Sequence, residues 1–494
     1  MAREEEMIKE RMKKIEELEK LKIAPYAYSY DKKDFAIKLQ EKYNKLANEE
    51  KTKDRVKIAG RILGMRLLGK INFAGLQDSS GKIQIVIEEG NAGKKLVEFF
   101  SKFIDNGDFI GVEGTIFRTK RGELSINTDK IEILAKALLP MPEKWHGLQD
   151  VEERFRKRYL DLMLNSDVKK VFETRAKIMK ILRNFMEKHN FIEVETPLLQ
   201  AVYGGAHAKP FKTHSDAYNS DVYLSIAPEL YLKRALVGGF ERVYEITKKF
   251  RNEGADKTHN PEHMTIEWYQ AYADYDDGMR LFEELMKEIA IEIFGKTTIE
   301  YQGQKIDLSK WKRLPLLDAI NEYTKEDVEK IKTDSEAKKI AKKHGIDEKE
   351  ITKANIADAL LKTFREKIIQ PTFLIDYPLE MAPLARTSRK DKTKAEIFQP
   401  IIAGMEIGRA YSELNEPLLQ EEHFKEQEQE RKAGNKEAMP VDTDFVEALK
   451  YGMPPACGVG IGIERLVMLF TNTVNISDVI MFPFMKPIKE EKSQ

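Results

Sequence analysis

Residues 244–275 read YEITKKFRNEGADKTHNPEHMTIEWYQAYADY, two runs of alternating residues around a polar turn. Alternation with a period of two is typical of β-strands, whose successive side chains point to opposite faces. The stretch therefore predicts an antiparallel hairpin. One face is apolar, with Met264, Ile266 and Trp268, and is expected to be buried. The other face carries a cation, a carboxylate and two rings, contributed by Arg251, Glu267, His263 and Tyr269.

The composition indicates a large globular protein without extracellular features. The 494 residues suggest two or three domains. The 83 basic and 83 acidic residues cancel, so RNA binding would depend on local patches rather than on net charge. The single cysteine, Cys457, excludes an intrachain disulfide and a CxxC zinc site and favours a reducing, cytoplasmic compartment. The sequence shows neither a signal-peptide core nor an apolar run of membrane-spanning length, so we expect no membrane association.

Three regions are expected ahead of the domain that contains the hairpin. Residues 1–54 are charged and helix-forming, which predicts a helical N-terminal extension, either a docking helix or an ordinary surface helix. Residues 55–135 contain short β-rich runs separated by Gly, Asn and Asp, which is typical of a small five-stranded barrel. Residues 136–165 begin with prolines and continue as a charged helical connector, so we expect a hinge.

The barrel region carries side chains suited to single-stranded RNA. Phe73 and Gln77 are four residues apart and therefore share one face of a strand. A ring can stack on a base, an amide can read its edge, and nearby cations can bind phosphates. The cations are Arg61, Arg66, Lys70, Arg118, Lys120 and Arg121. A barrel with this pattern could equally be a packing module.

Residues 166–488 are expected to form one domain of helices and strands around the hairpin, and residues 489–494 read as a solvated tail. An amphipathic helix is predicted over residues 167–189. A Lys- and Glu-rich helical insertion is expected over about 325–364, with a structural role only.

Carboxylates and glycines gather in the last hundred residues. A second apolar hairpin at residues 398–414 contains two glutamates, and an unpaired charge is costly in such surroundings. Three alternate glycines follow on one strand, where another backbone or a ligand can come close. Arg465 then opens a helix, a position that favours anions. Internal salt bridges and helix packing explain these features equally well. The residues concerned are Glu406, Glu413, Gly458, Gly460 and Gly462.

Read in order, these segments resemble the three signature motifs of class II aminoacyl-tRNA synthetases. Residues 191–197, FIEVETP, resemble motif 1; FRNEG with HNPE in the hairpin resembles motif 2; and GVGIGIER, residues 458–465, resembles motif 3. The segment APELYLKR, residues 227–234, is similar to the lysyl enzymes, and FAGLQD and TKRGELS resemble their anticodon-binding domain. The resemblance covers about residues 55–487. It implies an α+β fold with an N-terminal OB-fold β-barrel and a catalytic domain built on an antiparallel sheet flanked by helices.

The resemblance implies ATP-dependent ligation of L-lysine to tRNA(Lys) through a lysyl-adenylate. It implies a cytoplasmic homodimer formed through motif 1, with ATP as a substrate and more than one Mg²⁺ as cofactor. The implied catalytic residues are Arg251 and Arg465. The implied amino-acid-binding residues are Gly205, Glu229, Glu267, Tyr269, Tyr411 and Glu413. ATP would be bound by Arg251, Glu253, His259, His263, Glu406, Gly462 and Arg465, the anticodon by Arg61, Phe73, Gln77 and Glu123, and Mg²⁺ by Glu406 with Gln399 as a neutral ligand.

Four positions depart from the pattern of the family. Gln399 stands where a second magnesium carboxylate is usual, and Arg409 stands where an asparagine borders the amino-acid pocket. His263 replaces the phenylalanine that stacks on adenine, and His207 replaces a small residue beside Gly205. These departures are expected to affect the number of metal ions and the substrate preference.

Three alternative functions remain compatible with the motifs. An aspartyl- or asparaginyl-tRNA synthetase would share barrel and motifs, but Glu229, Glu413 and Tyr269 argue against an acidic substrate. A ligase that lysylates a protein would not need the barrel. A catalytically silent RNA-binding paralogue would not need to retain Arg251 and Arg465.

Overall fold

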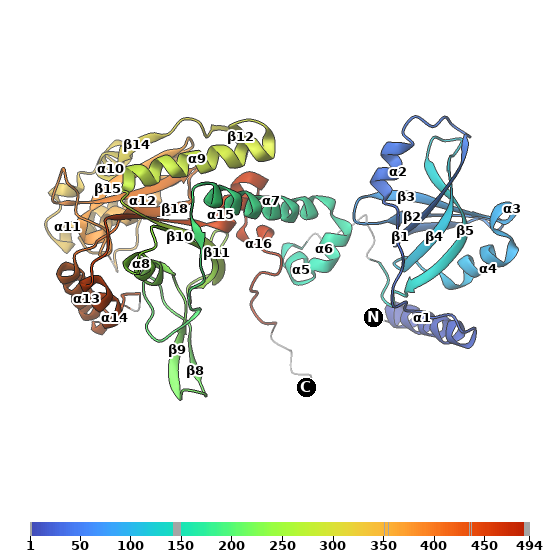
Figure 1. The fold of residues 1–494 in the computed structure, drawn as a ribbon, viewed down its shortest axis with the longest axis horizontal. Coiled ribbons are helices and arrows are strands. Elements are labelled where there is room, and N and C mark those ends of the chain that lie inside the picture. The colour runs from blue at the N-terminus through green and yellow to red at the C-terminus, as the bar shows by residue number, and fades with distance from the viewer. Residues whose placement is uncertain are drawn as a thin grey trace. The chain divides into compact units, whose positions relative to one another are not determined.

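The computed structural model describes residues 2–141, 150–349, 351–353, 355–433, 435 and 437–488 (Figure 1). The chain forms two compact units, Met1–Gly147 and Leu148–Gln494, and each is described by itself. The predicted tail at 489–494 and residues 142–149 of the predicted hinge lie outside the described residues. Among the described helices, none combines the length and apolar character needed to cross a membrane.

The first unit is a closed barrel with the strand order β1-β2-β3-β5-β4, which confirms the prediction of a five-stranded barrel. Alternate residues of its strands, such as Ile58, Ile85, Ile110 and Ile126, are fully buried and fill the barrel interior. The strands are β1 (Lys51–Leu67), β2 (Ile71–Gln77), β3 (Lys82–Glu88), β4 (Phe109–Arg118) and β5 (Leu124–Ala135). Helices α3 (Glu89–Ala92) and α4 (Lys94–Phe103) connect β3 to β4.

The N-terminal helices pack against this barrel. Helix α1 (Ala2–Lys20) is followed by the short α2 (Ala36–Lys42). Leu18 of α1 belongs to the same apolar core as the barrel strands. Arg11 donates hydrogen bonds to the carbonyl oxygens of Ala137, Leu139 and Asn106, at 2.6, 3.0 and 3.1 Å. The predicted N-terminal helix is therefore held by the unit itself through both apolar and polar contacts.

The second unit is built on a large sheet with the order β14-β15-β16-β18-β19-β11-β10-β6, in which β17 adds to β16. All neighbours are antiparallel except β6 with β10 and β14 with β15. The strands are β6 (Ile192–Glu193), β10 (Arg242–Phe250), β11 (Glu262–Ala271), β14 (Lys312–Pro315), β15 (Thr372–Pro378), β16 (Lys394–Ile402), β17 (Met405–Glu406), β18 (Gly408–Ser412) and β19 (Ala456–Gly462).

The predicted central hairpin is confirmed as β10 and β11. Its register pairs Glu245 with Glu267 and Lys249 with His263. Trp268 and Ile266 point into the main apolar core, where they meet helices α7 (Ser166–Lys188), α9 (Tyr275–Phe294) and α15 (Ile463–Thr471). Val459 and Ile461 of β19 enter the same core. The glycines and the polar side chains that alternate with these residues consequently occupy the opposite face of the sheet.

Further elements surround the large sheet. The predicted insertion contains α11 (Asp334–Lys343) and α12 (Ile356–Phe364), with the short helix η2 (Arg365–Lys367) after them. A separate small sheet has the order β7-β9-β8, and β12 pairs with β13. The remaining elements are α5 (Val151–Arg156), α6 (Arg158–Leu164), β7 (Leu199–Gln200), β8 (Lys212–Ser215), β9 (Ser220–Leu224), α8 (Glu229–Val237), β12 (Thr298–Tyr301), β13 (Gln304–Asp307), α10 (Leu316–Thr324), η1 (Val328–Lys330), η3 (Leu379–Met381), α13 (Pro417–Lys432), α14 (Thr443–Lys450) and α16 (Ile476–Val479).

Candidate active site

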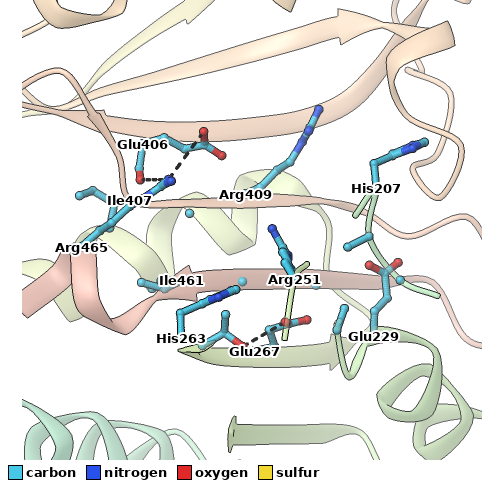
Figure 2. Close-up of a pocket in the computed structure, with 18 of the residues that line it drawn as sticks. His207, Glu229, Arg251, His263, Glu267, Glu406, Ile407, Arg409, Ile461 and Arg465 are labelled. Atoms are coloured by element: carbon cyan, nitrogen blue, oxygen red, sulfur yellow. Dashed lines mark hydrogen bonds and ion pairs between the residues drawn. The ribbon is translucent and has the colours of Figure 1, made fainter. Parts of the chain in front are cut away.

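A cavity of about 310 Å³ lies on the polar face of the large sheet. Figure 2 shows His263 and Glu267 of β11 and Arg409 of β18 standing on this face, together with Arg251 from the turn of the central hairpin. Glu229 and Glu267 lie towards one end of the cavity, Arg465 and Glu406 lie at the other, and Arg251 and Arg409 lie between the two ends. The predicted site residues that line it are Gly205, Glu229, Arg251, Glu253, His259, His263, Glu267, Tyr269, Glu406, Tyr411, Gly462 and Arg465.

Glu229 is the first residue of α8 and is almost completely buried. Its carboxylate accepts hydrogen bonds from Tyr411 Oη at 2.8 Å and from Lys233 Nζ at 2.7 Å. Gly205 lies against it with φ +85°, and a Cβ at this position would be 2.8 Å from Glu229 Cβ. A side chain at residue 205 would therefore be strained and would displace Glu229.

Lys233 is a site residue that the sequence interpretation missed. It is fully buried, and its ammonium also pairs with Glu413 Oε2 at 2.5 Å. Burial opposes the charge of Lys233, but Glu229 and Glu413 raise its pKa. Glu229 and Lys233 are four residues apart in the segment APELYLKR, a spacing at which a helix brings side chains together. This four-residue spacing is the sequence feature from which Lys233 could have been predicted as a partner of Glu229.

Glu413 lies behind the wall of the cavity rather than on it. Burial and the nearby Glu229 raise the pKa of its carboxyl to about 8, although Lys233 opposes the shift. A Cβ at Gly458 would overlap both Glu413 Oε1 and the ring of Tyr269. Glu413 Oε1 and the Tyr269 ring therefore pack directly over Gly458, where the absence of a side chain leaves them room.

Glu267 faces the cavity from the middle of β11. Burial raises the pKa of its carboxyl to about 7, with Glu229 acting in the same direction and Lys249 against it. Thr265 Oγ1 donates a hydrogen bond to it at 3.2 Å. Lys249 is fully buried on the neighbouring strand, where burial lowers its pKa, and it was also missed from the sequence. The buried carboxylates still outnumber the two lysines at this end of the cavity.

The guanidinium group of Arg465 lies at the opposite end of the cavity, and that of Arg251 lies between the two ends, beside Glu267 (Figure 2). Arg465 Nη1 donates to the carbonyl oxygen of Glu406 at 2.9 Å, and its Nη2 lies 3.1 Å from His259 Nε2. Within the described part of the chain, the Arg251 side chain makes no hydrogen bond or ion pair, and its Nε is buried. Burial and Arg251 lower the pKa of His263 to about 3, so its ring is neutral near pH 7.

The two predicted metal ligands differ in what they can bind. Gln399 is buried outside the lining of the cavity; its Oε1 accepts a hydrogen bond from Tyr377 Oη, and its amide hydrogen-bonds to Glu406. Glu406 keeps a lowered pKa and can ligate an ion brought in by phosphates, whereas the oxygen of Gln399 is already engaged. Within the described residues, no three His, Cys, Asp or Glu side chains are grouped to hold a metal. The residues thus fit one Mg²⁺ at Glu406 and do not fit a second at Gln399.

The predicted anticodon residues belong to the first unit. Phe73 and Gln77 lie on the outer face of β2, while Asn72, Ala74 and Leu76 point inward. Arg61 pairs with Gln77 in the β1–β2 register, and its guanidinium lies 4.1 Å from the centre of the Phe109 ring. Glu123 is exposed just before β5. Gln77 pairs with Lys82 of β3, and two residues further along β3 Gln84 pairs with Ser125 of the parallel strand β5. Glu123 comes two residues before Ser125, so it lies at the same end of the strands as Lys82 and Gln77.

Comparison with known proteins agrees with this architecture. The family model of the class II tRNA synthetases (D, K and N) matches residues 150–486, and that of an OB-fold nucleic acid binding domain matches residues 56–134. The lysine–tRNA ligase of Pelotomaculum thermopropionicum is 47% identical over 487 residues, which cover 98% of this chain and 95% of that protein. Those of Carboxydothermus hydrogenoformans and Moorella thermoacetica are 46% and 44% identical, with 98% and 99% of both chains covered.

These matches confirm the resemblance seen in the motifs, together with the α+β fold and the OB-fold barrel. The closed barrel and the mainly antiparallel sheet agree with the two matched families. The chain belongs to the class II tRNA synthetases (D, K and N), with an N-terminal OB-fold nucleic acid binding domain.

Proposed function

We propose that this chain catalyses the ATP-dependent ligation of L-lysine to tRNA(Lys) through a lysyl-adenylate. The observation that carries the proposal is one cavity in which Glu229 and Glu267 lie towards one end, while Arg465 at the other end and Arg251 between the ends supply guanidinium groups. The first end suits ammonium groups and the second suits phosphates. Full-length similarity to proteins named lysine–tRNA ligase supports the same activity.

The carboxylate-rich end would bind the amino acid. Glu229 and Glu267 face the cavity and would pair with the ammonium groups of lysine, and Glu413, packed over Gly458 behind the wall, would add negative charge. Tyr269 and Tyr411 would enclose the aliphatic chain, while Gly205 leaves room for the backbone. The side-chain carboxylate of aspartate would be repelled here, which makes an aspartate substrate unfavourable.

In the first step, a lysine carboxylate oxygen would attack the α-phosphorus of ATP. A bond from this oxygen to phosphorus forms, the bond to the bridging oxygen breaks, and pyrophosphate leaves. No side chain needs to act as a nucleophile, so positioning and charge stabilisation supply the rate. Arg251 would bind the α-phosphate and stabilise the charge that develops there, and Arg465 would bind the γ-phosphate.

The other residues that line the cavity near Arg465 would make the remaining contacts with ATP. His263 and Arg465 would enclose the adenine ring, and the neutral state of His263 suits stacking. Glu253 and His259 would help to place ATP, and Gly462 leaves space beside the stem of Arg465. Mg²⁺ bound to the phosphates, with Glu406 as its protein ligand, would neutralise charge on the leaving pyrophosphate.

In the second step, a terminal ribose hydroxyl of tRNA would attack the lysyl carbonyl carbon and release AMP. Phe73 would stack on an anticodon base, Gln77 and Glu123 would read base edges, and Arg61 would support this surface. We also propose a cytoplasmic homodimer formed through the motif 1 segment, because Ile192, Leu198 and Leu199 expose apolar surface there.

The test is ATP–pyrophosphate exchange without tRNA over the twenty amino acids and ornithine, with Mg²⁺ varied. Exchange that depends on lysine alone is expected. Exchange with aspartate or asparagine would assign the chain to those specificities instead. Absence of exchange with every amino acid would favour a catalytically silent RNA-binding paralogue.

A further inference from the structure

Three guanidinium groups act on the carboxylate of Glu406: Arg409 and Arg465 line the cavity, and Arg365 lies outside its lining. Arg365 Nη1 lies 3.4 Å from Glu406 Oε2, and Arg465 Nη1 lies 3.8 Å from the same oxygen. Burial raises the pKa of Glu406, but Arg465, a hydrogen bond with Gln399, Arg409 and Arg365 together lower it. We call Arg365, Arg409 and Arg465 the guanidinium cluster. Three positive charges around one carboxylate leave this corner able to accept further anionic groups.

Arg409 acts on Glu406 through its charge but, unlike Arg365 and Arg465, it makes no direct ion pair among the described residues. It is exposed to the cavity from β18, and its guanidinium lies 5.5 Å from the centre of the Tyr377 ring. Figure 2 shows it between Glu406 and His207. Burial and Arg409 lower the pKa of His207 to about 4, so this neighbour is neutral near pH 7. A phosphate oxygen would find an available charged donor here.

The packing of the helical insertion positions Arg365 in the guanidinium cluster. Ile356, Leu360 and Phe364 anchor α12 in a separate apolar core, and η2 follows directly. The turn before Glu406 is bonded to the same segment, because Ala403 N donates to Ile369 O at 2.9 Å and Gly404 N to Ile368 O at 2.8 Å. The insertion therefore fixes a cation beside Glu406, in addition to the structural role expected from the sequence.

Gln399 could bind a metal ion at this corner only by giving up its present hydrogen bonds. Tyr377 Oη donates to Gln399 Oε1, and burial raises the pKa of Tyr377, so the phenol stays protonated and keeps donating. Mg²⁺ prefers carboxylate, phosphate and water oxygens in an octahedron. A neutral oxygen that already accepts a hydrogen bond is a poor addition to that set.

We propose that Arg365 and Arg409 bind the β- and γ-phosphates of ATP, and the released pyrophosphate, directly, and supply the charge that a metal at Gln399 would give. This inference rests on the proposed function, because it assigns the residues to the same ATP site. The planar guanidinium group matches phosphate oxygens with two parallel hydrogen bonds. The chain should consequently bind pyrophosphate without a divalent metal.

The experiment is calorimetric titration of the full chain with pyrophosphate, in EDTA and in excess Mg²⁺. The wild type should bind in EDTA within about 10-fold of its affinity in Mg²⁺. Arg365→Ala and Arg409→Ala should each weaken binding in EDTA by about 10-fold or more, as expected for a lost charged hydrogen bond. Arg365→Lys and Arg409→Lys should lose less, since they keep the charge. Arg313→Ala, which removes an exposed arginine paired with Glu283, is the matched control and should change nothing.

Gln399→Glu gives the reverse test. A carboxylate at this position should weaken binding in EDTA and strengthen it in Mg²⁺. Binding that requires Mg²⁺ in the wild type, or alanine variants that bind as well as the control, would overturn the inference. If pyrophosphate binds in EDTA but lysine supports no exchange, only the proposed function fails; if lysine supports exchange but pyrophosphate needs Mg²⁺, only this inference fails.

Discussion

Lys233 Nζ lies 2.5 Å from Glu413 Oε2, and neither side chain reaches solvent. The same ammonium bonds to Glu229, so one buried lysine holds two of the carboxylates assigned to the amino acid. A buried charge that loses its partner is strongly destabilising, whereas an exposed ion pair contributes little. The pair therefore belongs to the framework of the protein as much as to its binding site.

Lys233→Met should lower the free energy of unfolding by about 3 kcal/mol or more. The loss should grow with pH. A carboxyl with a raised folded pKa binds protons on folding, so its contribution to stability falls as pH rises towards the folded pKa, here about 8 for Glu413. Removing the lysine raises this pKa further. Urea unfolding at pH 7 and pH 9 measures the difference, because the two proteins diverge as the pH passes the folded pKa of Glu413 in the wild type.

The matched control is Lys248→Met, which removes a lysine that is more than half exposed and pairs with Glu262 on the next strand. It should cost less than about 1 kcal/mol at both pH values. An equal loss in the two variants would contradict a special role for the buried pair.

Lysine binding should strengthen as pH rises from 6 to 8. The carboxyls of Glu267 and Glu413 have raised pKa values of about 7 and about 8, so both are largely protonated at pH 6. An ammonium group favours the deprotonated form, and the affinity should gain up to about 10-fold per pH unit for each proton released. Calorimetry without ATP measures it. Glu267→Gln should bind lysine more weakly and with a flatter pH profile; an unchanged profile would remove Glu267 from the linkage.

Gly458→Ala should abolish lysine binding while the fold persists. The added methyl group would overlap Glu413 Oε1 and the Tyr269 ring, and such overpacking costs about 1–3 kcal/mol of stability. Lysine-dependent exchange and urea unfolding report the two effects separately. Gly90→Ala is the control, because a Cβ there meets nothing within 4 Å. Normal lysine binding by the Gly458 variant would show that the packing of Glu413 and Tyr269 over this glycine is not needed for the lysine pocket.

Phe73→Ala should weaken tRNA binding by about 5- to 150-fold, the range for one lost base stack, and leave adenylate formation unchanged. The residue belongs to the barrel unit, whereas the cavity belongs to the second unit. Filter binding and pyrophosphate exchange measure the two functions. Tyr28→Ala removes another exposed ring of the barrel unit and serves as the control. Unchanged tRNA affinity would reject the assignment of the anticodon surface.

The sequence predicted those parts of the fold that depend on local alternation. The hairpin, the inward face with Trp268 and the glycine face of β19 follow from periodicity and were confirmed. The motifs also identified residues that meet only in the folded chain, such as Arg251 and Arg465. The buried lysines that neutralise the carboxylates of the site were harder to foresee. Lys249 reads as an ordinary strand residue, and only the folded sheet shows that it is buried beside Glu267.

Arg365 is a second residue of the candidate site that could not be predicted from the sequence. It follows an insertion whose sequence is rich in lysine and glutamate and contains no recognisable motif. Its position beside Glu406 depends on the packing of α12 and on two backbone hydrogen bonds to the turn before β17. Sequence spacing contains no information about such a long-range contact, so only the three-dimensional structure could show it.

Strand β11 sets the spacing between the groups proposed to bind the two substrates. His263, Thr265, Glu267 and Tyr269 stand on one face at two-residue steps, so the ring proposed for adenine and the carboxylate proposed for the ammonium group are about 13 Å apart along the strand. Neighbouring strands on both sides hold this strand in register. The distance between the two substrates is thus set by hydrogen-bonded backbone, and a one-residue slip in the register of β11 would turn every one of these groups into the apolar core.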